Sequence, residues 1–316
     1  MTNLIHAPAP ARVRFRGPMG GRPALVTVMA LATFAAAQRL GAQAAPVSSR
    51  VAAPLGDSAA RAARRPGLPR TPVSELRELD PDRPDRTEGP TTVDVGHVQF
   101  EVEAFDVARD RDRGIRSTEM AFGHTTVRVG VLPNVDLHLV VETFTVSRQS
   151  GPGAPRETTS GFGDLTPRLK LNLWGNDGGG SAGAILPFVK LPTAREGIGN
   201  DAVEGGVIFP VTFSLPAGFD LGAMTEIDAK RDDEGDARHA AWINSASLGR
   251  DLTSRLGAYL ELYGEYSARP GIWATTVDGG VKYRVSRDVI LDAGVDVGAS
   301  HAADDLLAFV GFTIRR

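Results

Sequence analysis

The sequence predicts an all-β protein, an antiparallel up-and-down transmembrane β-barrel of about twelve strands. Apolar and polar residues alternate from Val93 to the C-terminus, in segments long enough to be membrane-crossing strands. The connections between these segments are alternately tight and long, and the first residues of the chain are typical of an export signal. These three observations favour a barrel in the outer membrane of a Gram-negative-type cell envelope.

Residues 1–44 are predicted to be a cleaved signal peptide. Four arginines precede an apolar run that starts at Pro23, and small residues occupy the −3 and −1 positions of a cleavage site ending at Ala44. A buried core helix is the alternative interpretation of this run. Elsewhere no apolar run approaches the length of a membrane-spanning helix, so such helices are excluded.

The composition excludes several kinds of site and partner. The chain has no cysteine, so disulfides, thiolate metal sites and cysteine nucleophiles are excluded. The net charge is −3, and removal of the five arginines in residues 1–45 leaves −8. Affinity for nucleic acid depends on clustered Lys and Arg, so no nucleic-acid partner is expected.

Residues 45–92 are predicted to be a disordered periplasmic linker that ends in a barrel-entry segment, because they contain few large apolar residues. The last part, "DPDRPDRTEGP" from Asp80, is dense in charge but lacks metal-ligand spacing, and its three prolines keep it extended. We expect it to enter at the periplasmic rim and partly plug the lumen. The alternative is a plain approach to the first strand. The residues expected to pair with lumen charges are Arg83, Asp85, Arg86 and Glu88.

Residues 93–316 are predicted to form the barrel. Four connections look tight, near Pro133, Pro216, Asp251 and Ser286, and "GNDGGGS" is intermediate. The longer, hydrophilic connections include "RDRDRGIRS" and "RQSGPGAPRETTSG". Tight periplasmic turns alternating with outer loops are typical of outer-membrane barrels, and they place both chain ends in the periplasm. The segments 184–191 and 239–249 are the least regular strands.

The polar faces of these strands predict a wet, charged interior. Mixed signs indicate no preference for anions or cations. The alternatives are a lumen sealed by paired charges, or a soluble sandwich with the same periodicity. The few aromatic residues expected at the membrane interfaces are Trp174, Trp242, Trp273 and Tyr283. The residues predicted to bind substrate or to line the lumen are Glu101, Glu103, Arg128, Glu142, Arg168, Lys170, Lys190, Glu261, Glu265, Lys282 and Arg284.

Several motifs in order, "DRPDRTEGP", "GFGDLTPRLKLNLWG", "LPFVKLPTA", "DGGVKYRVSRDVILDAGVDVG" and "AADDLLAFVGFTIRR", resemble a known family. From Asp82 to the C-terminus the chain is similar to outer-membrane barrels grouped under a meta pathway of phenol degradation and often labelled transporters. The resemblance implies about twelve strands and passage of small, often aromatic or hydrophobic, molecules. Two features depart from the family pattern. Ala194 stands where a glycine is usual, and the chain ends in Arg315 and Arg316 instead of an aromatic residue read by the barrel-assembly machinery.

Three motifs have some features of chemical sites. "GFGDL" at Gly161 is followed by a strand and not by a helix, so it predicts a bend or bulge and not a phosphate loop. "RDDEGD" at Arg231 lacks the full ligand spacing of a calcium loop. "SHAADD" offers Ser300, His301 and Asp304, but adjacent strand residues point to opposite faces, which disfavours a barrel-wall lipid hydrolase. No catalytic residue, metal or cofactor is predicted.

The predicted function is a non-enzymatic outer-membrane channel or transporter for passive passage of small molecules. The expected partners are outer-membrane lipid, a small-molecule permeant and the barrel-assembly machinery. The alternatives are a structural or adhesive barrel with a closed lumen, and a lipid hydrolase.

Overall fold

The computed structural model describes residues 70–232 and 235–316, so the predicted signal peptide lies outside the described residues. Among them, no helix has the length and apolar character needed to cross a membrane. The linker predicted to be disordered as far as residue 92 has a defined position from residue 70 onward, where it includes a 3-10 turn, η1 (Val73–Glu75). Its hydrogen bonds to the barrel supply the order that its own apolar content could not.

The strands of the described chain form one antiparallel sheet. A second 3-10 turn, η2 (Pro216–Gly218), joins two of them. The strands are β1 (Val98–Asp112), β2 (Ile115–Leu132), β3 (Val135–Val141), β4 (Phe144–Gly151), β5 (Ala154–Gly161), β6 (Leu165–Trp174), β7 (Ser181–Lys190), β8 (Glu204–Leu215), β9 (Phe219–Arg231), β10 (Arg238–Asp251), β11 (Leu256–Ser267), β12 (Ile272–Ser286), β13 (Val289–Gly298) and β14 (Leu306–Arg315).

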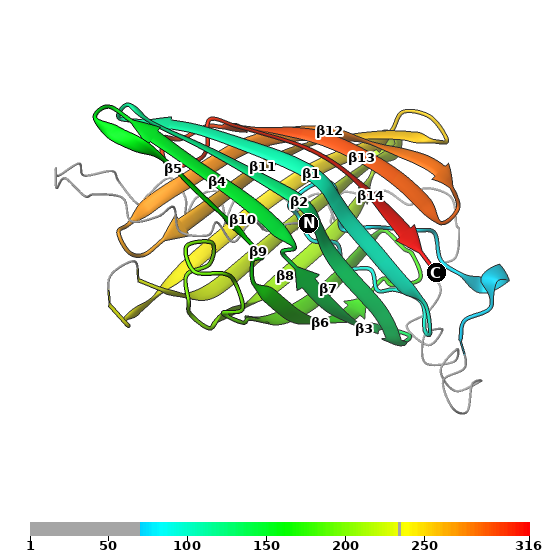
Figure 1. The fold of residues 1–316 in the computed structure, drawn as a ribbon. Helices are drawn as coiled ribbons and strands as arrows, with labels where there is room; N and C mark the ends of the chain where they lie inside the picture. The colour runs from blue at the N-terminus through cyan, green and yellow to red at the C-terminus, as the bar shows by residue number, and fades with distance from the viewer. Residues whose placement is uncertain (1–69, 233–234) are drawn as a thin grey trace.

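The sheet closes into a barrel because β1 pairs with both β14 and β2 (Figure 1). β3 and β4 pair with successive parts of β2 and together occupy one strand position of the wall. β6 and β5 pair with β3 and β4 and together occupy the next position, so the 14 strands fill twelve positions. The prediction of an antiparallel barrel of about twelve strands is confirmed. Segments 184–191 and 239–249, the least regular in the sequence, belong to strands β7 and β10.

The connections divide the barrel into two ends. We call the end with the connections 133–134, 175–180, 216–218, 252–255 and 287–288 the turn end, and the opposite end the loop end. Both residue 70 and the C-terminus lie at the turn end, since the amide of Thr71 donates to the carbonyl of Val95 and the amide of Val98 donates to the carbonyl of Arg316. The described chain therefore enters and leaves the barrel at the same rim.

Two segments expected to be long loops are instead paired strands. β1 and β2 are joined only by Arg113 and Gly114, whose φ angles of 48° and 86° suit a tight hairpin turn. β4 and β5 are likewise joined by Pro152 and Gly153. The hydrophilic residues of these segments predict loops, because a strand pair exposed to solvent has no apolar face that would distinguish it in a sequence.

The strand faces differ as the alternation predicts. On β1, Gln99, Glu101 and Glu103 are buried inside, whereas Phe100 is exposed outside. Aromatic residues gather on the outer face toward the loop end, where the ring of Tyr266 lies 6.0 Å from that of Trp242 and 4.9 Å from that of Trp273. Such rings are typical of membrane interfaces.

Two neighbouring wall positions are interrupted at the same level. β3 gives way to β4 at Glu142, and β5 gives way to β6 around Asp164, where the amide of Asp164 donates to Glu142 Oε2 at 3.0 Å. Gly163 is required here, because a Cβ would collide with the Glu142 side chain. The "GFGDL" motif therefore forms a bend between strands.

Candidate functional site: the barrel interior

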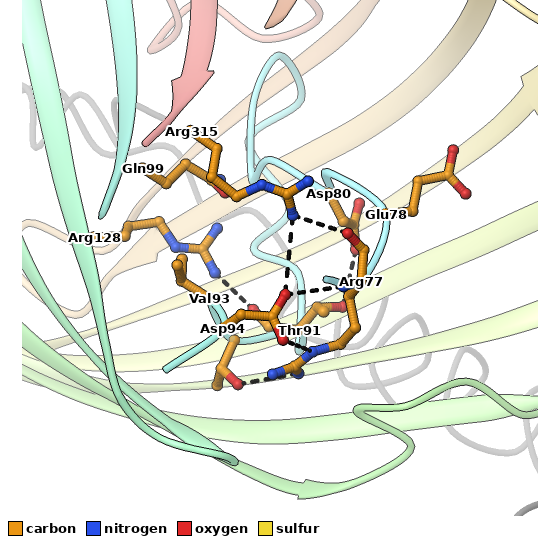
Figure 2. Close-up of a pocket in the computed structure, with 10 residues that line it drawn as sticks. Arg77, Glu78, Asp80, Thr91, Val93, Asp94, Gln99, Arg128 and Arg315 are labelled. Atoms are coloured by element: carbon orange, nitrogen blue, oxygen red, sulfur yellow. Dashed lines mark hydrogen bonds and ion pairs between the residues drawn. The ribbon is translucent and has the colours of Figure 1, made fainter. Parts of the chain in front are cut away.

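The chain from Asp80 to Pro90, which we call the entry segment, lies inside the barrel. It is anchored at the turn end by Arg77, whose amide and Nε donate to Asp94 at 2.9 and 3.0 Å and whose carbonyl accepts from Arg315 Nη1 at 2.8 Å. Arg77, Asp94, Arg128 and Arg315 line a polar pocket at this rim (Figure 2). The C-terminal strand thus helps to hold the base of the entry segment.

Asp82 forms the first buried group of ion pairs inside the barrel. Its carboxylate accepts from Lys170 Nζ at 2.7 Å and lies 3.0 Å from Arg128 Nη1. The amides of Asp82 and Arg83 both donate to the Glu101 carboxylate at 3.3 Å. Burial alone would raise the pKa of Asp82, but Arg128 and Lys170 outweigh it and hold that pKa well below its usual range.

Arg83 joins two further strands. Its guanidinium donates to Glu103 on β1 at 2.9 Å and to Asp292 on β13 at 2.7 Å. The same guanidinium lies over the ring of Phe309, 5.5 Å from its centroid. Charge-assisted pairs of this geometry are among the stronger hydrogen bonds.

Arg86 and Thr87 reach deeper, to β10, β11 and β13. Arg86 Nη2 donates to Asp296 at 2.5 Å, and its guanidinium lies 4.8 Å from the ring centroid of Tyr263. The amides of Arg86 and Thr87 both donate to the Glu261 carboxylate at 2.7 Å. The Thr87 hydroxyl also lies 2.6 Å from that of Ser245.

Residues 88–91, where the chain leads back toward the first strand, are bonded to β6, β9 and β2. Glu88 accepts from Arg168 Nη1 at 2.7 Å, and its amide donates to the sulfur of Met224 at 3.4 Å. Asn172 donates to the carbonyl of Pro90, and Arg128 donates to the carbonyl of Thr91. Residues 80–91 therefore contact strands all around the barrel and cross its lumen.

Most of the predicted lumen residues lie inside, but they form two groups. Asp85 of the entry segment interacts with Ser247 and Lys282. Arg284 pairs with Glu78 at the turn rim at 2.6 Å. The predicted residues bonded to the entry segment are Glu101, Glu103, Arg128, Arg168, Lys170 and Glu261.

The second group lies in the loop half and is bonded to the wall and its loops. Lys190 donates to Asn200 at 2.7 Å and pairs with Glu204 at 2.9 Å. Glu265 accepts from Lys230 at 2.6 Å. Glu142 is placed at the strand interruption described above, where it accepts from the amide of Asp164 and fixes the bend.

Sequence reasoning missed an apolar group on the inner face. Among the described residues, Leu186 and Ile208 are completely buried there and pack with aromatic and sulfur-containing neighbours. The available signal was that β8 reads "GGVIFPVTFSL", which is apolar on both faces and not only on one. The group comprises Ala184, Leu186, Phe188, Ile208, Met224, Ile243 and Tyr263.

The "SHAADD" motif does not form a hydrolase site. Ser300 Oγ accepts from the amide of Thr275 at 2.9 Å and donates to the carbonyl of Trp273 at 3.2 Å, which fixes it as a structural contact. A different chain of bonds occurs at the loop end, where Ser267 Oγ lies 2.8 Å from His239 Nε2. His239 Nδ1 lies 2.7 Å from Asp232 Oδ1. This hydrogen bond from His239 lowers the pKa of Asp232.

A closed twelve-position barrel with an apolar outer face and a charged interior defines an outer-membrane β-barrel protein. Residues 81–315 match the family model described as "Putative MetA-pathway of phenol degradation", and the chain belongs to this family. The resemblance inferred from the motifs is thereby confirmed.

One solved structure supports the fold, and another is similar over much of its length. The COG4313 outer membrane channel from Pseudomonas putida F1 superposes with a TM-score of 0.54 at 11% identity, over 76% of this chain and 100% of that one. The NanC porin gives a TM-score of 0.46 at 9% identity, over 68% of this chain and 98% of that one. No match was found among curated proteins.

Proposed function

We propose that this protein is an outer-membrane channel for passive passage of small molecules, and that the entry segment closes it until it is displaced. The observation that carries the proposal is the path of residues 80–90 across the lumen, with bonds to β1, β6, β10, β11 and β13. The family and the channel of similar fold support passage as the function, and passage needs no covalent chemistry.

The composition of the interior supports small permeants with apolar parts. Beside the ion pairs lie the aromatic rings of Phe188, Tyr263 and Phe309, and the first two belong to the buried apolar group. In the closed barrel an arginine contacts each ring. Displacement of the entry segment would remove Arg83 and Arg86 and expose the rings of Phe309 and Tyr263, while Arg168 would stay beside Phe188, so the lining would keep both aromatic and cationic surfaces. Aromatic molecules can stack on either kind of surface, in keeping with the family description.

The test is the conductance of purified barrels in planar bilayers. Replacing residues 80–90 by an equal length of Gly and Ser should raise single-channel conductance several-fold, because the crossing chain loses its ion pairs. A matched control, Arg83→Lys with Arg86→Lys, keeps both charges and should stay near the wild-type conductance. If the replaced chain folds but does not conduct, the interior side chains themselves close the barrel, and a structural role replaces the proposed function.

A second candidate function, ester hydrolysis at the loop-end mouth, is favoured by the bonds joining Ser267, His239 and Asp232. Their distances of 2.8 and 2.7 Å are those of a serine triad. In such a reaction Ser267 Oγ would attack an ester carbonyl and pass its proton to His239, which returns it to the departing alcohol. Water would then release the acid. Against this, the Ser267 hydroxyl also donates to the carbonyl of Arg269 at 2.7 Å.

Labelling with a fluorophosphonate separates a reactive serine from a structural one. A triad predicts covalent labelling of folded wild-type barrels that is lost in Ser267→Ala and in His239→Gln but kept in Ser300→Ala. Absence of labelling in the wild type would mean that the three residues only connect the loop ends of β10 and β11 to Asp232, and would leave passage as the function.

A further inference from the structure

We propose that Glu103, Asp106 and His124 form a binding site for one divalent transition-metal ion on the inner wall between β1 and β2. One ligand atom from each of the three side chains lies within 4.8 Å of the others, and all three residues are buried. The site is separate from the proposed passage function and does not depend on it.

Irregular backbone brings the two carboxylates to the same face. Residues three apart on a regular strand point to opposite faces, but the β1 register shifts between Glu103 and Phe105. As a result Ala104 and Phe105 both face outward and Glu103 and Asp106 both face inward. His124 is the direct cross-strand partner of Glu103 on β2. Bulges that re-aim side chains in this way are common next to functional sites.

Two polar atoms in the cluster have no hydrogen-bond partner in the described structure, namely Asp106 Oδ2 and His124 Nδ1. Their residues are only 2% and 4% exposed. Buried polar atoms without a partner cost about 1–3 kcal/mol each, so they need an explanation. A bound cation would satisfy both atoms at once.

The other ring nitrogen of His124 is already engaged. Its Nε2 lies 3.3 Å from the hydroxyl of Thr145 on β4. Metal-binding histidines use this arrangement, in which a second residue orients the ring through one nitrogen while the other nitrogen binds the metal. Thr145 is therefore a positioning residue for the site.

The local charge also favours a divalent cation. Arg83 pairs with Glu103 and Asp292, and Asp106 is the third carboxylate of this neighbourhood. One guanidinium faces three carboxyl groups here, and the side chains of Glu103 and Asp106 are hydrogen-bonded to each other, so a divalent cation would take the place of the proton that they share. Arg83 bonds Oε2 of Glu103 and would stay paired with it.

The donor set selects the class of metal. Two carboxylates and one imidazole suit Zn²⁺, Co²⁺, Mn²⁺ or Fe²⁺ better than Mg²⁺ or Ca²⁺, which prefer oxygen alone. Ligand atoms around a tetrahedral ion lie roughly 3.3 Å apart, so binding must draw these side chains together by on the order of 1 Å.

The test uses the full chain, purified without a histidine tag, folded in detergent and stripped with a chelator. Titration with Co²⁺, followed by its visible absorption, and with Zn²⁺, followed by calorimetry, should give one ion per barrel. Asp106→Asn and His124→Gln should each weaken binding by at least about tenfold. The matched control His301→Gln removes an exposed histidine outside the cluster and should change nothing.

Two further measurements control for variants that fail to fold. Heat-modifiable gel mobility shows whether each variant folds, and zinc-edge X-ray absorption of the wild type needs no variant. The expected spectrum has one imidazole and otherwise oxygen ligands. The proposal is overturned by absence of stoichiometric binding to the wild type, by binding that survives in both variants, or by a spectrum with several imidazoles.

Discussion

The two halves of the barrel interior satisfy their charges in different ways. In the turn half, the acids and bases of the wall bond to the entry segment: Lys170 to Asp82, Arg168 to Glu88 and Asp292 to Arg83. In the loop half, Lys190 on β7 bonds to Glu204 on the neighbouring strand and to Asn200 in a loop, and Lys230 on β9 bonds to Glu265 on β11, two strands away.

This difference separates a sealed lumen from a plugged one. Charges that pair within the wall stay neutralised whatever happens in the lumen. Charges that pair with an inserted chain are left uncompensated when it leaves, and a displaced chain leaves behind a polar, hydrated path. The ion pairs of the turn half can therefore be broken by displacement of the entry segment, whereas those of the loop half stay within the wall.

The largest expected effect comes from removing both arginines of the entry segment. Arg83→Ala with Arg86→Ala leaves Glu103, Asp292 and Asp296 without their main partners, and breaking a buried pair typically costs about 3–5 kcal/mol. We expect the segment to leave the lumen, with a rise in bilayer conductance and new proteolytic cleavage between residues 70 and 92. A folded double variant with wild-type conductance and protection would show that these pairs do not hold the segment.

A matched pair of lysines tests the contrast between the halves. Lys170→Gln removes a partner of Asp82, whereas Lys190→Gln removes a partner of Glu204, and both lysines are buried. We expect both to lower stability to urea by a few kcal/mol, about the cost of an unpaired buried charge. Only Lys170→Gln should raise conductance. Equal conductance changes would mean that the two halves do not differ in the way described.

The smallest effect is a pH dependence through Glu88, which lies outside the strands. Burial and the charge of Asp82 raise its pKa to about 7. A raised carboxyl pKa means that the docked segment holds a proton that the displaced segment releases, so docking strengthens as pH falls from about 7 toward the usual Glu value of about 4.3. Conductance should fall modestly over that range, and Glu88→Gln should flatten the response. A rise in conductance on acidification, reversed by the same variant, would contradict the assignment.

Much of the fold follows from the sequence because a period of two is a property of neighbouring residues. The alternation on β1, from Val98 through Val102, specifies which face meets lipid, and the tight turns near Pro133 and Ser286 specify the order of strands. The two hydrophilic hairpins at Gly114 and Gly153 could not be predicted, since an exposed ladder has the same composition as a loop.

The charged character of the interior could be predicted from the sequence, but the pairs that its residues form could not. The family resemblance places this charged, proline-containing chain just before the first strand and so predicts that it enters the lumen, but the partners of Arg83 lie 20 and 209 residues away and depend on closure of the barrel. The cluster of Glu103, Asp106 and His124 depends on a register shift that no spacing rule reveals. The bonds of Ser267 to His239 likewise join strand ends 28 residues apart.

Tethering the entry segment to the wall tests whether passage requires displacement of residues 80–90. The hydroxyls of Thr87 and Ser245 lie 2.6 Å apart, and the chain has no cysteine, so Thr87→Cys with Ser245→Cys places one disulfide between segment and wall. Conductance would be recorded on the same barrels before and after reduction. We predict that oxidised barrels stay closed and that reduction restores the wild-type conductance. Equal conductance in both states would show that passage does not require displacement of the segment.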